Sequence, residues 1–160
     1  FASPTMGIAM VHHRDWRVTM HRRDLLVMRL VQDGQFVAQC NVTPAGTASE
    51  DRDADATKFQ TQVAAAIQKN AGEIDEISTA KTESGVEIQR ITANGRTGET
   101  PITWIYYLLT REDGRRMAVV FTLASDQREA FGGSDHDLIG SLQMVDENRS
   151  AETREDSTQR

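Results

Sequence analysis

Side chains that could bind a metal ion gather near the start of the chain, where three of its four histidines lie. His12 and His13 are adjacent, so on a strand they would point to opposite faces and could not share a metal. His12 and His21 could approach each other if Asp15 marks a turn between paired strands. With that aspartate or with Asp24 they would form a histidine–carboxylate site. Solvated histidines on an edge hairpin are the simpler interpretation, and we predict no metal ion and no cofactor.

The same stretch is basic, because five arginines accompany the histidines: Arg14, Arg17, Arg22, Arg23 and Arg29. Guanidinium groups suit carboxylates and phosphates, so these arginines could bind an acidic partner or a phosphate. Charged residues also keep an exposed edge strand from pairing with another sheet, which is the simpler interpretation. Alternate positions on one expected strand make Arg17, Thr19 and His21 the candidate partner-binding rim.

The chain lacks a recognisable catalytic motif. Asp135, His136 and Asp137 carry suitable groups, but successive helix residues do not face each other. Ser141 has no glycine-elbow context, and no phosphate-binding loop occurs. A glycine pair at 132–133 before a helix is only a weak sign of an anion site. We therefore predict no catalytic residue and a protein that is not an enzyme.

Length and charge limit the class of protein. A chain of 160 residues can bury a core of its own, and we predict a single domain over residues 1–145. Residues 146–160 are polar and charged without an aromatic side chain, which predicts a disordered acidic tail or linker.

The net charge of −6 argues against nucleic-acid binding. No apolar run approaches the roughly 20 residues of a membrane helix. The single cysteine, Cys40, excludes an internal disulfide.

Alternating apolar and polar residues predict an antiparallel sheet of about six to seven strands. The alternation is clear over residues 16–21, as in a half-buried strand. Asp33-Gly34 predicts a tight hairpin, because both central residues of the favoured turn need positive φ. Asp113-Gly114 predicts a second hairpin, Ser84-Gly85 a further turn, and residues 73–82 a short edge strand.

A long helix is predicted from about Asp55 to Ala71, after a loop over residues 43–54. Its apolar stripe consists of Phe59, Val63, Ala66 and Ile67. The acids ahead of it, at 50–55, lack the spacing of a calcium loop and suit the positive end of a helix dipole. Gly72 lies where a left-handed C-terminal cap is expected.

One or two short helices are expected to close the fold. Their starts are predicted from two capping pairs, Asp126 with Glu129 and Ser134 with Asp137.

Aromatic residues offer a candidate ligand pocket between sheet and helix, formed by Phe59, Trp104 and Tyr106. Aromatic side chains on a central strand more often belong to the core, so packing is the simpler interpretation. Cys40, on a strand, is expected to be a small buried apolar residue.

Three segments of the second half carry a family resemblance: residues 82–86 (TESGV), 101–107 (PITWIYY) and 114–122 (GRRMAVVFT). Phe131, Asp135, Leu138, Ser141 and Leu142 continue the pattern, which resembles the Mog1/PsbP-like superfamily, especially its small bacterial members of unassigned function. The resemblance covers about residues 11–144 and rests on core and turn positions. It implies an α-β-α sandwich whose antiparallel sheet is flanked by a long helix and a C-terminal helix.

The resemblance also favours accessory or binding roles over catalysis. The superfamily includes a photosystem II extrinsic subunit, a Ran-binding nuclear transport factor and many bacterial envelope proteins, but no partner-binding residue carries over to this chain. We predict a protein-binding module of a bacterial envelope or multiprotein system. The alternative is a small-molecule or lipid carrier that uses the pocket at Phe59, Trp104 and Tyr106. An extracytoplasmic location is expected if a signal peptide or lipid anchor precedes Phe1.

Overall fold

The computed structural model describes residues 1–146, and these divide into two compact units. The larger unit runs from Asp15 to Gly132, and the smaller unit joins Phe1–Arg14 to the described residues from Gly133 onward. The single domain over residues 1–145 stays a prediction. The tail predicted for residues 146–160 lies, except for Asp146, outside the described residues.

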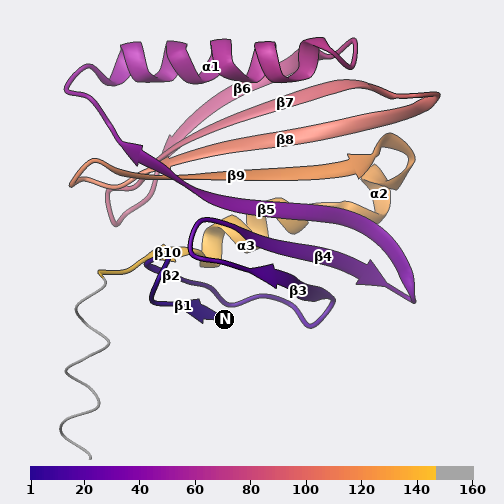
Figure 1. The fold of residues 1–160 in the computed structure, drawn as a ribbon, viewed down its shortest axis with the longest axis horizontal. Helices are drawn as coiled ribbons and strands as arrows, with labels where there is room; N and C mark the ends of the chain where they lie inside the picture. Colours follow the sequence, from indigo (N-terminus) through magenta and orange to yellow (C-terminus); the bar gives the residue numbers. More distant parts are fainter. Residues whose placement is uncertain (147–160) are drawn as a thin grey trace, which may run out of the picture. The chain divides into compact units, whose positions relative to one another are not determined.

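A seven-stranded antiparallel sheet forms the larger unit, in the strand order β3-β4-β5-β9-β8-β7-β6 (Figure 1). Its strands are β3 (Trp16–His21), β4 (Leu26–Gln32), β5 (Gln35–Thr47), β6 (Glu73–Lys81), β7 (Glu87–Thr97), β8 (Thr100–Thr110) and β9 (Arg115–Ala124). The predicted α+β class and the antiparallel sheet of six to seven strands are confirmed. β6 lies at one edge, as expected for its sequence, and β3 lies at the other.

The two Asp-Gly corners fold differently. Asp33 and Gly34 have φ of 50° and 78°, and they connect Gln32 directly to its pairing partner Gln35, so the tight hairpin is confirmed. At the second corner Gly114 has a φ of 88°, while Asp113 is not left-handed. The chain there turns through residues 111–114, closed by the Gly114 amide donating to the Arg111 carbonyl over 2.9 Å.

The segment before the long helix differs from the prediction. β5 continues to Thr47, pairing with β9 past Pro44 by way of a register shift, which tolerates a residue without an N–H. α1 then runs over Arg52–Gln68, and the Asp51 side chain caps it by accepting from the Ala54 amide over 2.9 Å. The predicted loop over 43–54 is too long at both ends, because β5 runs to Thr47 and α1 begins at Arg52 after its cap at Asp51. The helix start predicted at about Asp55 is wrong for the same reason.

The helix also ends differently. Ala71, not Gly72, takes the left-handed conformation, with φ of 49°, so the predicted cap is wrong. Gly72 has another role: a Cβ on it would lie 2.6 Å from Cβ of Ile67 and 2.8 Å from that residue's carbonyl oxygen. The chain leaves α1 in close contact with its last turn, which requires a residue without a side chain.

Both faces of the sheet carry apolar clusters. α1 lies against β6 and β7 and buries Phe59 and Val63 in a cluster with Ile91 and Leu108. On the opposite face the Phe121 ring packs edge-on with three other rings at 5.8–5.9 Å between centroids: Trp16, Tyr107 and Phe131. Phe131 belongs to α2 (Arg128–Phe131), which follows the 3-10 turn η1 (Ser125–Gln127).

The smaller unit contains a three-stranded sheet and one helix. β2 (Ile8–Ala9) pairs with β1 (Ala2–Ser3) on one side and with β10 (Gln143–Met144) on the other. α3 spans Ser134–Ser141. No helix within residues 1–146 is long and apolar enough to cross a bilayer.

The expected capping pairs are wrong. The N-cap residues of α2 and α3 are Gln127 and Gly133, and neither makes a side-chain cap bond. Asp126 lies in the preceding 3-10 turn, and Ser134 is already inside the first turn of its helix.

Candidate functional site

Two grooves flank the first half of α1 within the larger unit. The basic groove, of about 270 Å³, lies toward β5, β8 and β9 and is lined by Ala45, Asp55, Lys58, Phe59, Gln62, Leu108, Arg116 and Ala118. The acidic groove, of about 250 Å³, lies toward β6, β7 and β8 and is lined by Arg52, Asp53, Asp55, Ala56, Thr79, Ala80, Glu87, Ile88, Gln89, Leu108 and Thr110. Two cations face one carboxylate in the basic groove, and three carboxylates face one arginine in the acidic groove.

The two grooves share an apolar floor. Leu108 lines both of them, and it is 7% exposed. Phe59, 9% exposed, packs in the same cluster and borders the basic groove alone. A ligand in either groove would therefore touch the core of the larger unit.

Asp55 lies between the grooves, and Ser49 binds both of its carboxylate oxygens. The Ser49 amide donates to Oδ2 over 2.7 Å, and the Ser49 hydroxyl donates to Oδ1 over 2.9 Å. These bonds, chiefly that of the hydroxyl, lower the pKa of Asp55, and the charges of Arg116 and Arg52 lower it further. The carboxylate is thus held ionised, with its oxygens already bound.

Two arginines at these grooves have an unsatisfied donor. Nε of Arg116 and Nη1 of Arg52 are buried, and neither atom has a hydrogen-bond partner within residues 1–146. A buried donor without a partner costs about 1–3 kcal/mol. Arg116 therefore retains hydrogen-bonding capacity beside the basic groove.

The predicted partner-binding rim lies on the edge strand β3, where every residue after Trp16 is exposed. A register shift between Val18 and Met20 interrupts the alternation, so Arg17 pairs opposite Arg29 and His21 opposite Leu26. Leu26 and Arg29 are three positions apart on β4 and point to opposite faces. Arg17 and His21 consequently do not share a face, and the Thr19 hydroxyl donates to the Val27 carbonyl at the irregularity.

Arg17 instead begins a row that crosses the sheet on the α1 side. The pairing runs from Arg17 to Arg29, then to Gln39, Thr122 and Trp104. Trp104 is four positions from Leu108 on β8, so this row shares the face that α1 contacts. Both arginines are exposed and the other three residues are partly exposed. We call Arg17, Arg29, Gln39, Thr122 and Trp104 the partner face.

The three residues of the predicted ligand pocket have different surroundings. Phe59 lines the basic groove, and Tyr106 packs against the cluster that contains Phe59. Burial raises the pKa of Tyr106. Trp104 lies beside Gly95, where an added Cβ would come within 2.7 Å of the indole. Neither Trp104 nor Tyr106 lines the grooves described above, and a pocket formed by all three stays a prediction.

Two of the four histidines lie close to polar atoms of their chain neighbours. Nδ1 of His12 lies 3.0 Å from the His13 carbonyl oxygen, and Nε2 of His136 lies 3.9 Å from Oδ2 of the buried Asp135. Within the part of the chain that the structure describes, no three His, Cys, Asp or Glu side chains are grouped so as to hold a metal.

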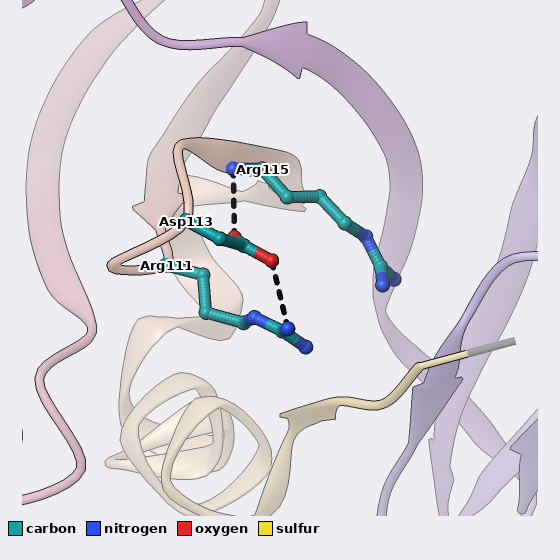
Figure 2. A network of polar contacts seen from close by, with 3 residues as sticks. All are labelled: Arg111, Asp113 and Arg115. Atoms are coloured by element: carbon teal, nitrogen blue, oxygen red, sulfur yellow. Dashed lines mark hydrogen bonds and ion pairs between the residues drawn. The ribbon is translucent and has the colours of Figure 1, made fainter. Parts of the chain in front are cut away.

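A polar network at the β8–β9 corner is structural. Figure 2 shows Asp113 accepting from the Arg115 amide over 3.1 Å and paired with Nη2 of Arg111 at 2.7 Å. The backbone bond is the largest cause of a lowered pKa at Asp113. The network joins residues of a single turn and thereby holds the hairpin.

Cys40 is fully buried, as expected of a small apolar residue, and burial raises the pKa of its thiol. It pairs opposite Phe121 in the sheet, so its sulfur is kept from solvent.

Sequence reasoning missed Lys58 and Arg116, which are far apart along the chain and meet only through the packing of α1 on the sheet. One signal was available. Arg116 alternates along its strand with the same phase as Ala118 and Val120, so it lies on the sheet face that a helix covers. Arginine is uncommon at covered positions, and its presence there indicates a special role.

Comparison with protein-family models and with curated protein sequences gives no match. Solved structures do match. Cyanobacterial PsbP from Synechocystis sp. PCC 6803 superimposes with a TM-score of 0.63 at 12% identity, over 91% of each chain. The Ran-binding protein Mog1p of Saccharomyces cerevisiae gives 0.60 at 9% identity, over 88% of this chain and 91% of its own.

LpqN, which is involved in cell envelope biogenesis of Mycobacterium tuberculosis, gives a TM-score of 0.58 at 10% identity, over 86% of this chain and 83% of its own. A protein of Bacteroides thetaiotaomicron gives 0.65 at 13% identity over 93% of this chain, which spans 49% of the length of that protein. At these identities the likeness establishes the fold, and the chain has the Mog1/PsbP-like fold.

Proposed function

We propose that the protein is a non-enzymatic binding or accessory module whose partner face binds an acidic surface of another protein. The observation that carries this proposal is the pairing of Arg17 opposite Arg29 on neighbouring strands, with both side chains exposed. Like charges directly opposite each other destabilise a sheet. Carboxylates on a partner would relieve that repulsion, and guanidinium groups bind them well.

The rest of the partner face suits a protein contact. Arg29 lies 6.0 Å from the centre of the Phe36 ring, and Phe36 is 52% exposed. Trp104, at the far end of the row, is partly exposed. Tryptophan and arginine are enriched among the residues that contribute most to protein–protein binding.

The proteins of similar fold support a binding role and an envelope setting. Mog1p is a Ran-binding protein, and LpqN is involved in cell envelope biogenesis. We extend to this chain only the general role, together with an extracytoplasmic location in a bacterial envelope, and not a particular partner.

Site-specific photo-cross-linking in the native host tests the proposal. A photoreactive residue replaces Thr122 on the partner face, and a matched probe replaces Ser78 on the exposed edge strand β6. We expect a discrete protein to cross-link at Thr122 and not at Ser78. The Arg29→Glu change should abolish the product, whereas Lys81→Glu, an equal change of charge on β6, should leave it.

Equal cross-linking at both positions, or a product that survives Arg29→Glu, would contradict the partner face. Turnover of a substrate from a broad panel, lost on changing one polar residue, would contradict the non-enzymatic part of the proposal.

Small-molecule or lipid carriage is a second candidate function. The observation that favours it is the pair of grooves beside α1, which expose part of the Phe59–Leu108 cluster. Thermal stabilisation by members of a ligand library would support carriage, and the absence of any stabilising ligand would contradict it.

A further inference from the structure

We infer that the basic groove is a site for a small carboxylate that carries an apolar body, such as a medium-chain fatty acid. This inference rests on the second candidate function, since it names the ligand class for carriage. It does not depend on the partner face.

The charge of the groove favours an anion. Lys58 and Arg116 line it, and no carboxylate within residues 1–146 forms an ion pair with either cation within 4.0 Å. Asp55, the one carboxylate at the groove, has both oxygens bound by Ser49. The Asp55 carboxylate therefore offsets part of the positive charge in the groove, but it leaves the N–H donors of Lys58 and Arg116 unoccupied.

Arg116 can donate to an additional partner. Its Nε is buried without an acceptor, and the residue borders the groove directly. A carboxylate that draws the guanidinium toward itself would supply charge-assisted hydrogen bonds, which are about twice as strong as bonds between neutral groups.

The remainder of the groove favours an apolar body on that anion. Phe59 and Leu108 form its deep side, and Ala45 and Ala118 border it from β5 and β9. A cavity of about 150 Å³ is known to hold benzene, so a groove of about 270 Å³ admits a ligand roughly twice that size. An eight-carbon chain with a terminal carboxylate meets both requirements.

The acidic groove provides an internal comparison. It has nearly the same volume and shares Leu108, but three carboxylates line it with a single arginine. An anion should therefore bind the basic groove in preference to the acidic groove. Arg52 in the acidic groove serves as the matched control for Arg116.

Isothermal titration calorimetry with octanoate, octanol, octylamine and inorganic phosphate tests the inference. We expect octanoate to bind best. Arg116→Gln should weaken it about tenfold or more, as expected for loss of a charged hydrogen bond, and Arg52→Gln should leave the affinity unchanged. Because Arg116 is partly buried, Lys58→Gln on the exposed side of α1 is a second variant that should weaken octanoate while preserving the melting temperature.

The outcomes separate the two claims. Binding of octanol as tight as that of octanoate, unaffected by Arg116→Gln and Lys58→Gln, would overturn the carboxylate inference and leave carriage standing. Binding of phosphate alone would overturn the requirement for an apolar body. If none of the four compounds binds at millimolar concentration, the carboxylate inference fails, and the ligand-library measurement then decides carriage separately.

Discussion

The two ends of α1 meet the sheet in different ways. At the C-terminal end the Arg96 amide of β7 donates to the Asn70 carbonyl over 2.9 Å, and a Cβ on Gly95 would lie 2.7 Å from that oxygen. At the N-terminal end charged side chains border two grooves. A glycine at position 95 thus allows direct backbone contact after the end of α1, whereas grooves of about 250 and 270 Å³ lie beside the start of the helix.

Leu108→Ala should have the largest effect on the N-terminal end of the α1 interface, because Leu108 is the floor of both grooves. Truncating a buried leucine typically costs about 2–5 kcal/mol. We expect a loss of that size in the free energy of unfolding, measured by urea denaturation. A loss below about 1 kcal/mol, close to the roughly 0.5 kcal/mol of an ordinary surface substitution, would mean that the N-terminal end contributes little to the core.

Gly95→Ala tests the close contact at the C-terminal end of α1. The new methyl group would collide with the Asn70 carbonyl and the Trp104 ring, and overpacking of this kind costs about 1–3 kcal/mol. We expect a lower free energy of unfolding by urea denaturation and a changed tryptophan fluorescence. Gly140→Ala in α3 is the control, since a Cβ there meets nothing within 4 Å. Equal stability of the two variants would show that the C-terminal end is not closely packed.

Asp55→Asn has the smallest expected effect and depends on pH. The pKa of Asp55 is lowered in the folded protein, so its ionised form stabilises the fold above the ordinary aspartate pKa. That contribution is lost as the pH falls through the lowered value. We expect the variant to melt below the wild type at neutral pH and alongside it in strong acid, as followed by circular dichroism.

Asp53→Asn is the control for this measurement. Ser49 donates two hydrogen bonds to the Asp55 carboxylate, whereas the Asp53 carboxylate accepts none within residues 1–146. A difference between Asp55→Asn and the wild type that does not vary with pH would contradict the role of Ser49 in holding the carboxylate ionised.

The sequence predicts the sheet because its signals are local. Asp33-Gly34 needs only two adjacent residues to specify a hairpin, and the alternation over residues 16–21 predicts a strand, although the register shift within β3 leaves no trace in that pattern. Strands of two residues, such as β1 and β10, are too short to show a period.

The candidate sites are less predictable because they depend on packing. Lys58 and Arg116 border one groove only after α1 is placed against β9. The predicted helix caps are wrong for a related reason. Several polar residues near each helix start could accept from its first backbone amides, and the path of the backbone decides which one does. Asp51 caps α1, whereas the sequence pattern predicted a helix start at about Asp55.

Because Cys40 is buried, the reactivity of its thiol reports how often the sheet opens to solvent. The thiol is fully enclosed, and burial raises its pKa, so it presents almost no reactive thiolate while the sheet is intact. Cys40 is the single cysteine of the chain. The rate at which an alkylating reagent modifies the protein would therefore measure local unfolding of the sheet around β5, without an engineered label.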